Sequence, residues 1–231
     1  MSIDFSQFEQ KAGVAFNDKK LLKQAFTHRS FINENKDAHL EHNERLEFLG
    51  DAVLELVITD YLFQTYPDKD EGTMTSLRSA VVNATTCAQV AAALEVNNFL
   101  LLSRGETKDV GRARQYILAN TLEAIIGAIY LDQGYEQAKQ FISQHISPLV
   151  DDIISNGTWI DAKSLFQEKA QEMLGITPVY ETIKETGPDH DKRFTIGVYL
   201  QKILIGSGDG ESKQDAEQEA AQKALEKKGW S

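Results

Sequence analysis

The sequence predicts an all-α domain followed by a small α+β domain with the element order α-β-β-β-α. Apolar residues recur at helical spacing through most of the first two-thirds of the chain, and no sustained two-residue alternation occurs before residue 176. Further on, Phe194, Ile196, Val198 and Leu200 alternate strictly, which predicts a strand with one buried face. The hydrophobic fraction of 42% supplies enough apolar surface for packed cores and excludes an intrinsically disordered chain.

Helices are expected throughout the first domain, residues 1–154. One follows the possible cap Asn17 or Asp18, and a long one is stopped by Pro67. Another follows Gly72, where Thr73 or Thr75 can cap it, and its spacing continues through Val81 to Leu94. A polar, glycine-bearing stretch predicts a loop at 104–111. The expected helices are 21–26, 43–66, the segment after Gly72, 117–131 and 137–154.

The small polar run Ser155-Asn156-Gly157-Thr158 predicts a hinge, so a linker is expected at 155–160 and the second domain at 161–231. Its first helix, 162–174, should end at Gly175. Val179 and Ile183 suggest one strand, and Ile203 and Ile205 a third after the alternating one. The last helix, 212–228, should bury a stripe of small and apolar residues: Ala216, Ala220, Ala221, Ala224 and Leu225.

The charge balance is acidic. There are 35 Asp and Glu against 24 Lys and Arg, a net charge of −11, of which −3 falls in residues 161–231. A nucleic-acid binder is expected to carry the opposite sign. Bulk charge therefore gives no support to nucleic-acid binding, which would have to rest on local arrangement.

Cysteine content and hydropathy point to a location inside the cell. The single Cys87 excludes an intramolecular disulfide framework and suits a reducing compartment. The first residues are polar and acidic, unlike a secretory signal, and no window approaches the ~20 apolar residues that a bilayer span needs. We expect a cytoplasmic protein with no membrane partner.

The most informative segment is Asn43 to Leu54. On a helix advancing ~100° per residue, Glu44, Glu47 and Asp51 fall within about 60° of one another, and Glu55 extends the stripe. Most of the remaining circumference is apolar or small, which predicts a buried helix whose carboxylates face a cleft. Crowded carboxylates in a cleft need protons, basic partners or a hard divalent cation.

A second apolar run, 117–131, contains a single charge, Glu123, with Asn120 one turn before it on the same face. A lone ionised Glu in such a run is costly unless it is paired or bound to metal. Oxygen ligands from two facing helices suit Mg²⁺, with Mn²⁺ as a possible substitute, and argue against zinc. Glu71, just before the Gly72 turn, can join this site from a helix entrance.

Structural interpretations stand beside these. A Glu-x-x-Glu pattern is usually a solvated face, and Glu123 can be paired with Arg45 or Arg78. His28 is better explained as a packing or capping residue, and His42 as structural. Cys87, in an Ala-rich helical pattern, is expected to fill core.

The run Glu44-Arg45-Leu46-Glu47-Phe48-Leu49-Gly50-Asp51-Ala52 resembles the nuclease signature of bacterial ribonuclease III. Thr27-His28-Arg29-Ser30 and the segment around Glu123 are similar to other landmarks of that family. The tail, with Gly187-Pro188-Asp189-His190 and Gly208 to Lys213, resembles a double-stranded-RNA-binding domain. The resemblance covers essentially the whole chain in the family's domain order.

The resemblance implies an endoribonuclease that cuts both strands of duplex RNA by metal-activated water attack, leaving 5′-phosphate ends and short 3′ overhangs. Ribosomal and messenger RNA precursors are the substrates it implies. By the same resemblance Glu47, Asp51 and Glu123 ligate the metal and Glu71 bridges to it or to its waters. Glu44 would act at the RNA-facing rim. Two sites require a symmetric homodimer, in which Phe48 inserts into a pocket of the partner.

One position departs from the family pattern. The commonest residue at position 120 in the family is Asp, and this chain has Asn120, whose amide oxygen can coordinate a cation but brings no charge. We expect cleavage to be retained, with weaker metal affinity or altered metal preference. The alternative from another class is a non-cleaving protein that binds duplex RNA and retains the fold. A di-metal helical bundle acting on small phosphates leaves residues 161–231 without a role.

The RNA-binding side chains are expected at three places in the second domain. Ser164, Gln167 and Gln171 share one helix face and can reach a minor groove, and His190 lies in a turn that can reach the next one. Lys213 sits at a helix start that can hold phosphates, although Glu211 and Gln214 flank it. Binding by this domain alone should therefore be weak and salt-sensitive.

Overall fold

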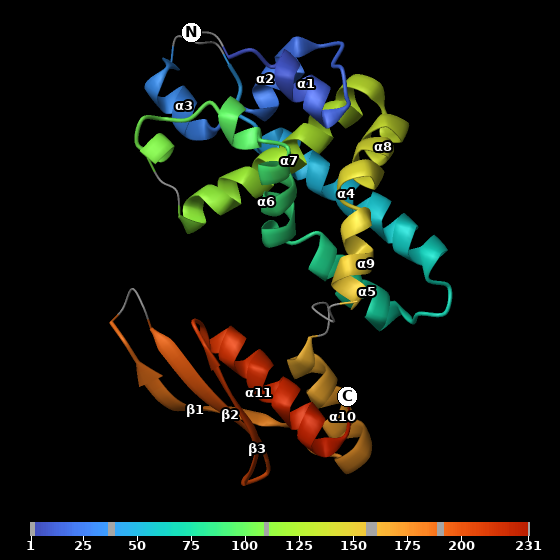
Figure 1. The fold of residues 1–231 in the computed structure, drawn as a ribbon, viewed down its shortest axis with the longest axis vertical. Helices are drawn as coiled ribbons and strands as arrows, with labels where there is room; N and C mark the ends of the chain where they lie inside the picture. Colours follow the sequence, from blue (N-terminus) through green and yellow to red (C-terminus); the bar gives the residue numbers. More distant parts are fainter. Residues whose placement is uncertain (1–2, 37–39, 109–110, 156–160, 189–191, 231) are drawn as a thin grey trace. The chain divides into compact units, whose positions relative to one another are not determined.

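The computed structural model describes residues 3–36, 40–108, 111–155, 161–188 and 192–230. The chain divides into two compact units, Met1–Trp159 and Ile160–Ser231. Figure 1 shows that the first is built of helices and that the second contains a small sheet with helices. The predicted fold class, all-α followed by α+β, is confirmed.

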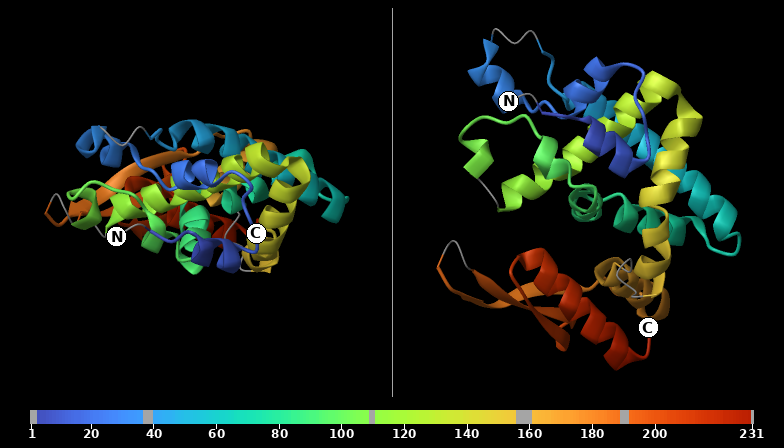
Figure 2. Two further views of the ribbon diagram at one scale, coloured as in Figure 1. Left: turned by 90° about the horizontal axis from the view of Figure 1, so that it is seen from above. Right: turned by 45° about the horizontal axis from the view of Figure 1, so that its top comes forward.

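The first unit is assembled around two long helices, α4 and α7, which cross one another (Figures 1 and 2). Shorter helices pack around this pair, and two short 3₁₀ segments follow α6. The described elements are α1 (Ser6–Ala12), α2 (Lys19–Ala25), α3 (Arg29–Glu34), α4 (Glu44–Thr65), α5 (Glu71–Val81), α6 (Ala84–Ala93), η2 (Val96–Phe99), η3 (Glu106–Lys108), α7 (Arg112–Gln133), α8 (Tyr135–His145) and α9 (Pro148–Ser155).

Glycine allows α4 and α7 to approach backbone to backbone. A Cβ on Gly127 of α7 would lie 2.2 Å from the carbonyl oxygen of Leu46, and one on Gly50 of α4 would lie 1.7 Å from that of Glu123. No other residue fits either position without moving the helices apart. The two helices therefore come closest where the segment Leu46–Gly50 of α4 crosses the segment Glu123–Gly127 of α7.

Both long helices bury apolar side chains around the crossing, including Leu54 and Ile58 of α4 and Leu122 and Ile125 of α7. At one end of the core, Phe8 meets Phe26 edge to face, with ring centroids 4.8 Å apart. Full burial of such side chains stabilises the fold by roughly 1.5–3 kcal/mol each. The positions of the acidic residues are thus set by a rigid core.

The second unit is a three-stranded antiparallel sheet in the order β1-β2-β3, packed on α10 and α11. Its elements are α10 (Ala162–Leu174), β1 (Val179–Thr186), β2 (Arg193–Leu200), β3 (Ile203–Gly210) and α11 (Lys213–Lys228). Alternate glycines of β3, at 206, 208 and 210, let α11 lie directly on the strand, because a Cβ on any of them would meet the α11 backbone within 2.7 Å. The predicted inner stripe of α11 is buried, as expected.

Several element boundaries differ from those predicted. Helix α5 begins at Glu71 and is capped by Asp70, whose Oδ1 accepts a hydrogen bond from the Thr73 N–H at 2.7 Å, so the expected threonine caps are wrong. The helical pattern through Val81 to Leu94 is broken at Asn83, whose side chain caps a separate helix, α6. The segment 137–154 forms two helices, because Pro148 cannot continue α8.

Two short helices were not predicted. Helices α1 and α3 have seven and six residues, too few for a clear periodic signal. The predicted loop 104–111 contains the short 3₁₀ segment η3. The predicted linker, 155–160, is corrected at its start, because Ser155 belongs to α9; its other residues lie outside the described ranges.

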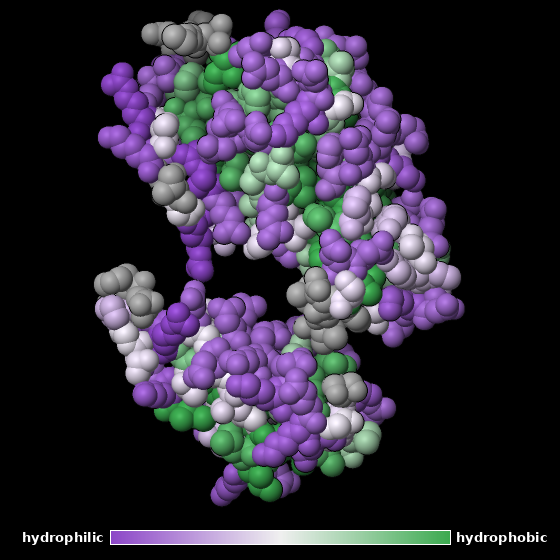
Figure 3. Space-filling model, viewed as in Figure 1, coloured by the Kyte–Doolittle hydropathy of each residue, from purple (hydrophilic) through white to green (hydrophobic). Residues whose placement is uncertain are grey.

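The prediction that α4 is buried on nearly all sides is wrong for the single chain. Phe48, Leu56 and Phe63 expose 81%, 56% and 69% of their surface, because α7 and the neighbouring helices cover only one side of α4. Figure 3 shows that hydrophobic residues lie between the hydrophilic ones on the face in view. Within the described ranges, no helix has the length and apolarity to cross a membrane.

Gly127→Ala should destabilise the first unit by about 3 kcal/mol, because the new methyl group would collide with the Leu46 carbonyl in a contact that cannot relax locally. The measurement is chemical denaturation of the full chain. Gly105→Ala is the matched control, since its nearest neighbour, Ser103 Oγ, would lie 3.8 Å away. A Gly127→Ala protein as stable as the control would contradict the close crossing.

Candidate active site

The helix crossing brings the acidic stripe of α4 beside Glu123 of α7. Glu47 and Asp51 flank Gly50, and Gly50 packs on the backbone of Glu123 itself. Glu47 and Glu123 are half-buried, whereas Asp51 is exposed. Asn120, one turn before Glu123, is also half-buried and hydrogen-bonds the Glu47 carboxyl group. The four residues predicted as metal ligands are therefore neighbours.

Their electrostatics show negative charge that is not fully compensated. Burial, followed by the charges of Asp51 and Glu47, raises the pKa of Glu123 to about 7. The pKa of Glu47 is also raised, mainly by burial and by Glu44, while the Asn120 hydrogen bond opposes the shift. Carboxyl groups with raised pKa values in one place are typical of functional sites.

The salt-bridge interpretation of Glu123 is wrong. Within the described ranges, no Lys, Arg or His nitrogen lies within 4.0 Å of its carboxylate. The Arg78 guanidinium donates instead to Thr59 Oγ1 at 3.2 Å, and Arg45 is exposed. Glu123 is thus a half-buried carboxyl group whose nearest charged neighbours are themselves acidic.

The donor set fits a hard divalent cation in its chemistry: three carboxylates and one amide oxygen, brought together from two rigid helices. The side chains do not form a closed ligand set, however, because within the described residues no three His, Cys, Asp or Glu groups converge as a metal site. Like charges repel at close range, which opposes convergence of the carboxylates in the absence of a cation.

Glu44 lies at the exposed start of the same stripe. Its Oε1 forms an ion pair with Arg29 Nη1 at 3.2 Å, and its Oε2 lies 3.8 Å from His42 Nδ1. These neighbours lie beside Glu44 at the start of α4, and its role at an RNA-facing rim stays a prediction.

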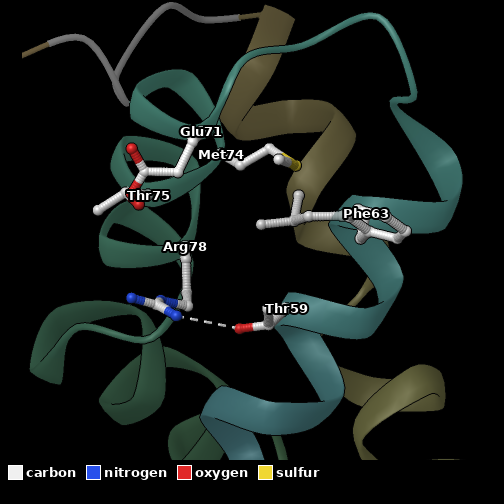
Figure 4. Close-up of a pocket in the computed structure, with 7 residues that line it drawn as sticks. Thr59, Phe63, Glu71, Met74, Thr75 and Arg78 are labelled. Atoms are coloured by element: carbon white, nitrogen blue, oxygen red, sulfur yellow. Dashed lines mark hydrogen bonds between the residues drawn. The ribbon is translucent and has the colours of Figure 1, made fainter.

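Glu71 requires a correction within the single chain. It was predicted to join Glu47, Asp51 and Glu123, but it lies at the start of α5, in a separate pocket between α4 and α5 (Figure 4). The residues that line this pocket do not include Glu123, and Glu71 is not among the residues that raise the pKa of Glu123. The turn at 67–70 directs α5 away from the α4–α7 crossing, which sequence spacing did not show.

The residues interpreted as structural behave as such. His28 caps α3, its Nδ1 accepting from the Ser30 N–H at 3.3 Å, and burial lowers its pKa. Cys87 is buried in α6, and burial raises the pKa of its thiol to about 12. His42 lies beside Glu44, half-exposed.

In the second unit, Ser164, Gln167 and Gln171 are all exposed on one face of α10, as predicted. Asp161 Oδ2 accepts a hydrogen bond from Ser164 Oγ at 2.8 Å, which orients the hydroxyl group. Glu168 and Glu172 lie beside the two glutamines and add negative charge to this face.

The two remaining predicted RNA-binding residues are His190 and Lys213. His190 lies outside the described residues. Lys213 is exposed at the start of α11, with Nζ 5.7 Å from the centroid of the Phe194 ring. Ser212 and Asp215 form a capping box there, which occupies part of the donor capacity of the helix end.

Phe48 lies beside the acidic stripe and faces outward. It borders a pocket of about 620 Å³ whose wall includes Leu21, Leu49 and Leu131. An exposed aromatic side chain next to a pocket with a partly apolar wall on the same surface is suited to a self-complementary contact.

Comparison with known proteins places the chain. The family model described as "Ribonuclease-III-like" matches residues 18–149, and the "Double-stranded RNA binding motif" model matches residues 162–228. A relative from Pelotomaculum thermopropionicum that is named Ribonuclease 3 is 46% identical over 219 residues, covering 95% of this chain and 91% of the relative. The chain belongs to the ribonuclease III family.

Further similarity agrees with this membership. A Ribonuclease 3 of Protochlamydia amoebophila is also 46% identical, covering 94% of this chain and 89% of its own length. The solved nuclease domain of ribonuclease III from Campylobacter jejuni is 41% identical, covers 63% of this chain and 97% of its own, and superposes with a TM-score of 0.58. The chain is thus a ribonuclease III-type double-stranded-RNA endonuclease with its RNA-binding domain.

Sequence reasoning missed Gly127, the residue that brings α7 onto the ribonuclease III signature helix. A signal was present, since a glycine in the interior of a buried helix is unfavourable unless a backbone passes close to it. Arg29, which pairs with Glu44, was quoted in a family landmark but not assigned a contact.

The stability of the metal-free protein should depend on Glu123 in a defined direction. Its folded pKa, about 7, lies above the ordinary value of 4.5, so the folded state binds this proton more tightly than the unfolded state. The free energy of folding that this proton contributes is fully present below about pH 4.5 and is lost as the pH rises to about 7.

Glu123→Gln should therefore melt at a higher temperature than the unmodified protein at pH 8 in a chelator, and the difference should shrink at pH 5. Adding Mg²⁺ at pH 8 should raise the melting temperature of the unmodified protein more than that of the variant. Glu55→Gln, an exposed carboxylate on the same helix, is the control. A Glu123→Gln variant less stable than the unmodified protein at pH 8 would contradict the raised pKa of Glu123.

Proposed function

We propose that this chain, as a homodimer, hydrolyses both strands of duplex RNA at the carboxylates of the α4–α7 crossing. The observation that carries the proposal is Glu123: a half-buried carboxyl group with a raised pKa, without a basic partner within the described residues, next to Asp51 and Glu47. The products would be 5′-phosphate ends with short 3′ overhangs, and the substrates ribosomal and messenger RNA precursors.

Glu47, Asp51, Glu123 and Asn120 would hold Mg²⁺, or Mn²⁺ in its place. When bound, the cation lowers the pKa of a water molecule and offsets the charge that develops on the leaving oxygen. Asn120 already orients Glu47 through its amide hydrogen bond, so it can help to fix the ligand geometry. Because it brings no charge, the site holds its cation less tightly than one with Asp in its place.

The remaining residues of the site position the substrate. Glu44, tied to Arg29, lies at the exposed rim where a duplex would arrive, and Arg29 places positive charge beside it. The two long helices keep the carboxylates in register because their backbones cannot slide past the glycine contacts. The backbone positions of the site are therefore preorganised, although within the described residues the carboxylates do not form a closed ligand set.

Cleavage of two strands requires two sites, which a two-fold dimer supplies. Phe48 of the partner subunit would enter the pocket lined by Leu21, Leu49 and Leu131, and the reverse contact would form at the same time. The Campylobacter jejuni structure is described as showing structural flexibility in a region involved in dimer formation of its nuclease domain. The exposed face of α4 offers this chain a surface for such a contact.

The second unit would hold the duplex through Ser164, Gln167 and Gln171, with Lys213 on a phosphate and His190 at the next minor groove. The acidic neighbours Glu168 and Glu172 weaken this grip at the glutamines. Both copies of the domain in a dimer can contact one duplex, and linking them raises the effective affinity without new contacts.

The central test is cleavage of long duplex RNA with Mg²⁺ and with Mn²⁺. We expect cutting with at least one ion, a loss of about a thousandfold or more in Glu123→Gln, and unchanged duplex binding by that variant. Glu55→Gln should cut normally. Absence of cutting by the unmodified protein with either ion would favour the non-cleaving alternative, to which the comparisons lend no support.

Asn120→Asp should lower the Mg²⁺ concentration needed for half-maximal cleavage, because the new carboxylate adds a charge to the ligand set. The measurement is a titration of the cleavage rate with each metal. If the variant and the unmodified protein required the same Mg²⁺ concentration, Asn120 would not belong to the residues that hold the metal.

Phe48→Ala should shift the chain toward monomer at micromolar concentration, as measured by analytical ultracentrifugation, because a buried aromatic anchor would be removed on both sides of the two-fold contact. Phe63→Ala removes another exposed ring from the same helix, 69% against 81% for Phe48, and is the control. A Phe48→Ala protein that stays dimeric would contradict the assigned interface.

A further inference from the structure

Helix α4 carries a second feature beyond the carboxylates. The side chains at 47, 51, 55 and 59 follow one another at four-residue spacing, so they form one stripe along the helix. The first three are acidic, and the fourth is Thr59, whose hydroxyl donates to the Glu55 carbonyl at 2.6 Å. With a rise of ~1.5 Å per residue, Thr59 lies ~12 Å along the helix from Asp51.

At Thr59 the stripe meets a pocket between α4 and α5. The pocket has a volume of about 210 Å³ and is lined by Thr59, Leu62 and Phe63 of α4 and by Glu71, Met74, Thr75 and Arg78 of α5. Figure 4 shows the Arg78 side chain reaching across from α5 to the Thr59 hydroxyl group. This pocket is not part of the carboxylate site.

Arg78 is held in place but its charge is not used within the described residues. It is half-buried, and its Nη1 donates to Thr59 Oγ1 at 3.2 Å. No Asp or Glu carboxylate of the described ranges lies within 4.0 Å of its guanidinium group, and Glu71, which lines the same pocket, does not pair with it. A guanidinium group has five N–H donors in a planar fork, so most of its donor capacity is free for a ligand.

The chemistry of this fork selects an anion with several oxygens, and phosphate matches it in charge and in geometry. An RNA strand whose cleaved phosphate lay at the carboxylates would carry further phosphates within the ~12 Å that separate Asp51 from Thr59 along the helix. The apolar side chains of Phe63 and Met74 lie at the same pocket and can contact the sugar beside such a phosphate.

We propose that Arg78, held by Thr59, binds a backbone phosphate of the duplex next to the cleavage site. This inference rests on the proposed function, because it assumes that RNA lies along α4. Arg78 is a substrate-contacting residue in this account, and Thr59 is its positioning residue. The contact is made to the sugar–phosphate backbone, so it adds affinity without sequence preference.

The test uses the full chain with Glu123→Gln, so that RNA is bound but not cut. Duplex RNA affinity is measured against salt concentration with and without Arg78→Gln. Removal of the phosphate contact should weaken binding about tenfold and lower the slope of log K against log salt by about one for each phosphate no longer neutralised. Arg78→Lys, which keeps the charge but not the fork, should recover part of the affinity.

Two further variants separate this role from a structural one. Thr59→Val removes the hydrogen bond and keeps the charge, so it should weaken binding less than Arg78→Gln does and leave the salt slope nearly unchanged. Lys20→Gln removes the same charge from α2, outside the pocket, and should leave the slope unchanged. Melting temperatures of all variants are measured alongside.

The inference is overturned if Arg78→Gln leaves the salt slope intact, whatever its melting temperature, or if Lys20→Gln lowers it equally. Cleavage by the chain without Glu123→Gln is measured in parallel. Cutting combined with an unchanged Arg78→Gln slope removes only the phosphate contact, whereas absence of cutting removes the proposed function itself.

Discussion

The close approach of two helix backbones is the constraint on which this molecule depends. Gly50 and Gly127 remove the side chains that would otherwise separate α4 from α7, and Glu47, Asp51, Asn120 and Glu123 lie around that contact. The apolar core on the other side of the helices supplies the free energy that keeps them together. Charge repulsion at the site is thus balanced by packing that lies elsewhere.

That repulsion is also what makes the site chemically useful. A half-buried Glu123 with a pKa of about 7 sits beside two other acids, and no basic side chain of the described ranges neutralises it. A divalent ion held there, as we propose, would relieve this cost and would couple metal affinity to fold stability. The family membership and the acidic composition are reconciled if, as we propose, the negative charge serves to hold a metal and RNA contacts depend on a few placed basic groups.

The separation of tasks continues along α4. Its carboxylate half meets α7, its outward face carries Phe48, and its far half borders the pocket of Arg78. One helix of 22 residues therefore carries all three of the contacts that we propose, at the reaction site, between subunits and to the RNA backbone. A rigid helix suits this combination because the distances between its side chains are set by its geometry.

Local signals in the sequence were sufficient for much of this description. The strict alternation in β2, the apolar runs of α4 and α7, and the small-residue stripe of α11 each predicted an element that is confirmed. Short elements such as α1 and α3 were missed because one or two turns carry too little periodicity, and Pro148 divided a run that looked continuous. The nine-residue signature with its second domain indicated the family directly.

By itself the sequence determined the two kinds of domain, the family and the oxygen-rich character of the site, because these follow from local patterning and residue type. Only the tertiary structure decided which acids are neighbours. It joined Glu123 to the α4 stripe, turned Glu71 into another pocket with Arg78, and left Phe48 exposed. The physical reason is that the helix crossing angle and the turn before α5 depend on contacts between residues far apart in the chain, which no local pattern records.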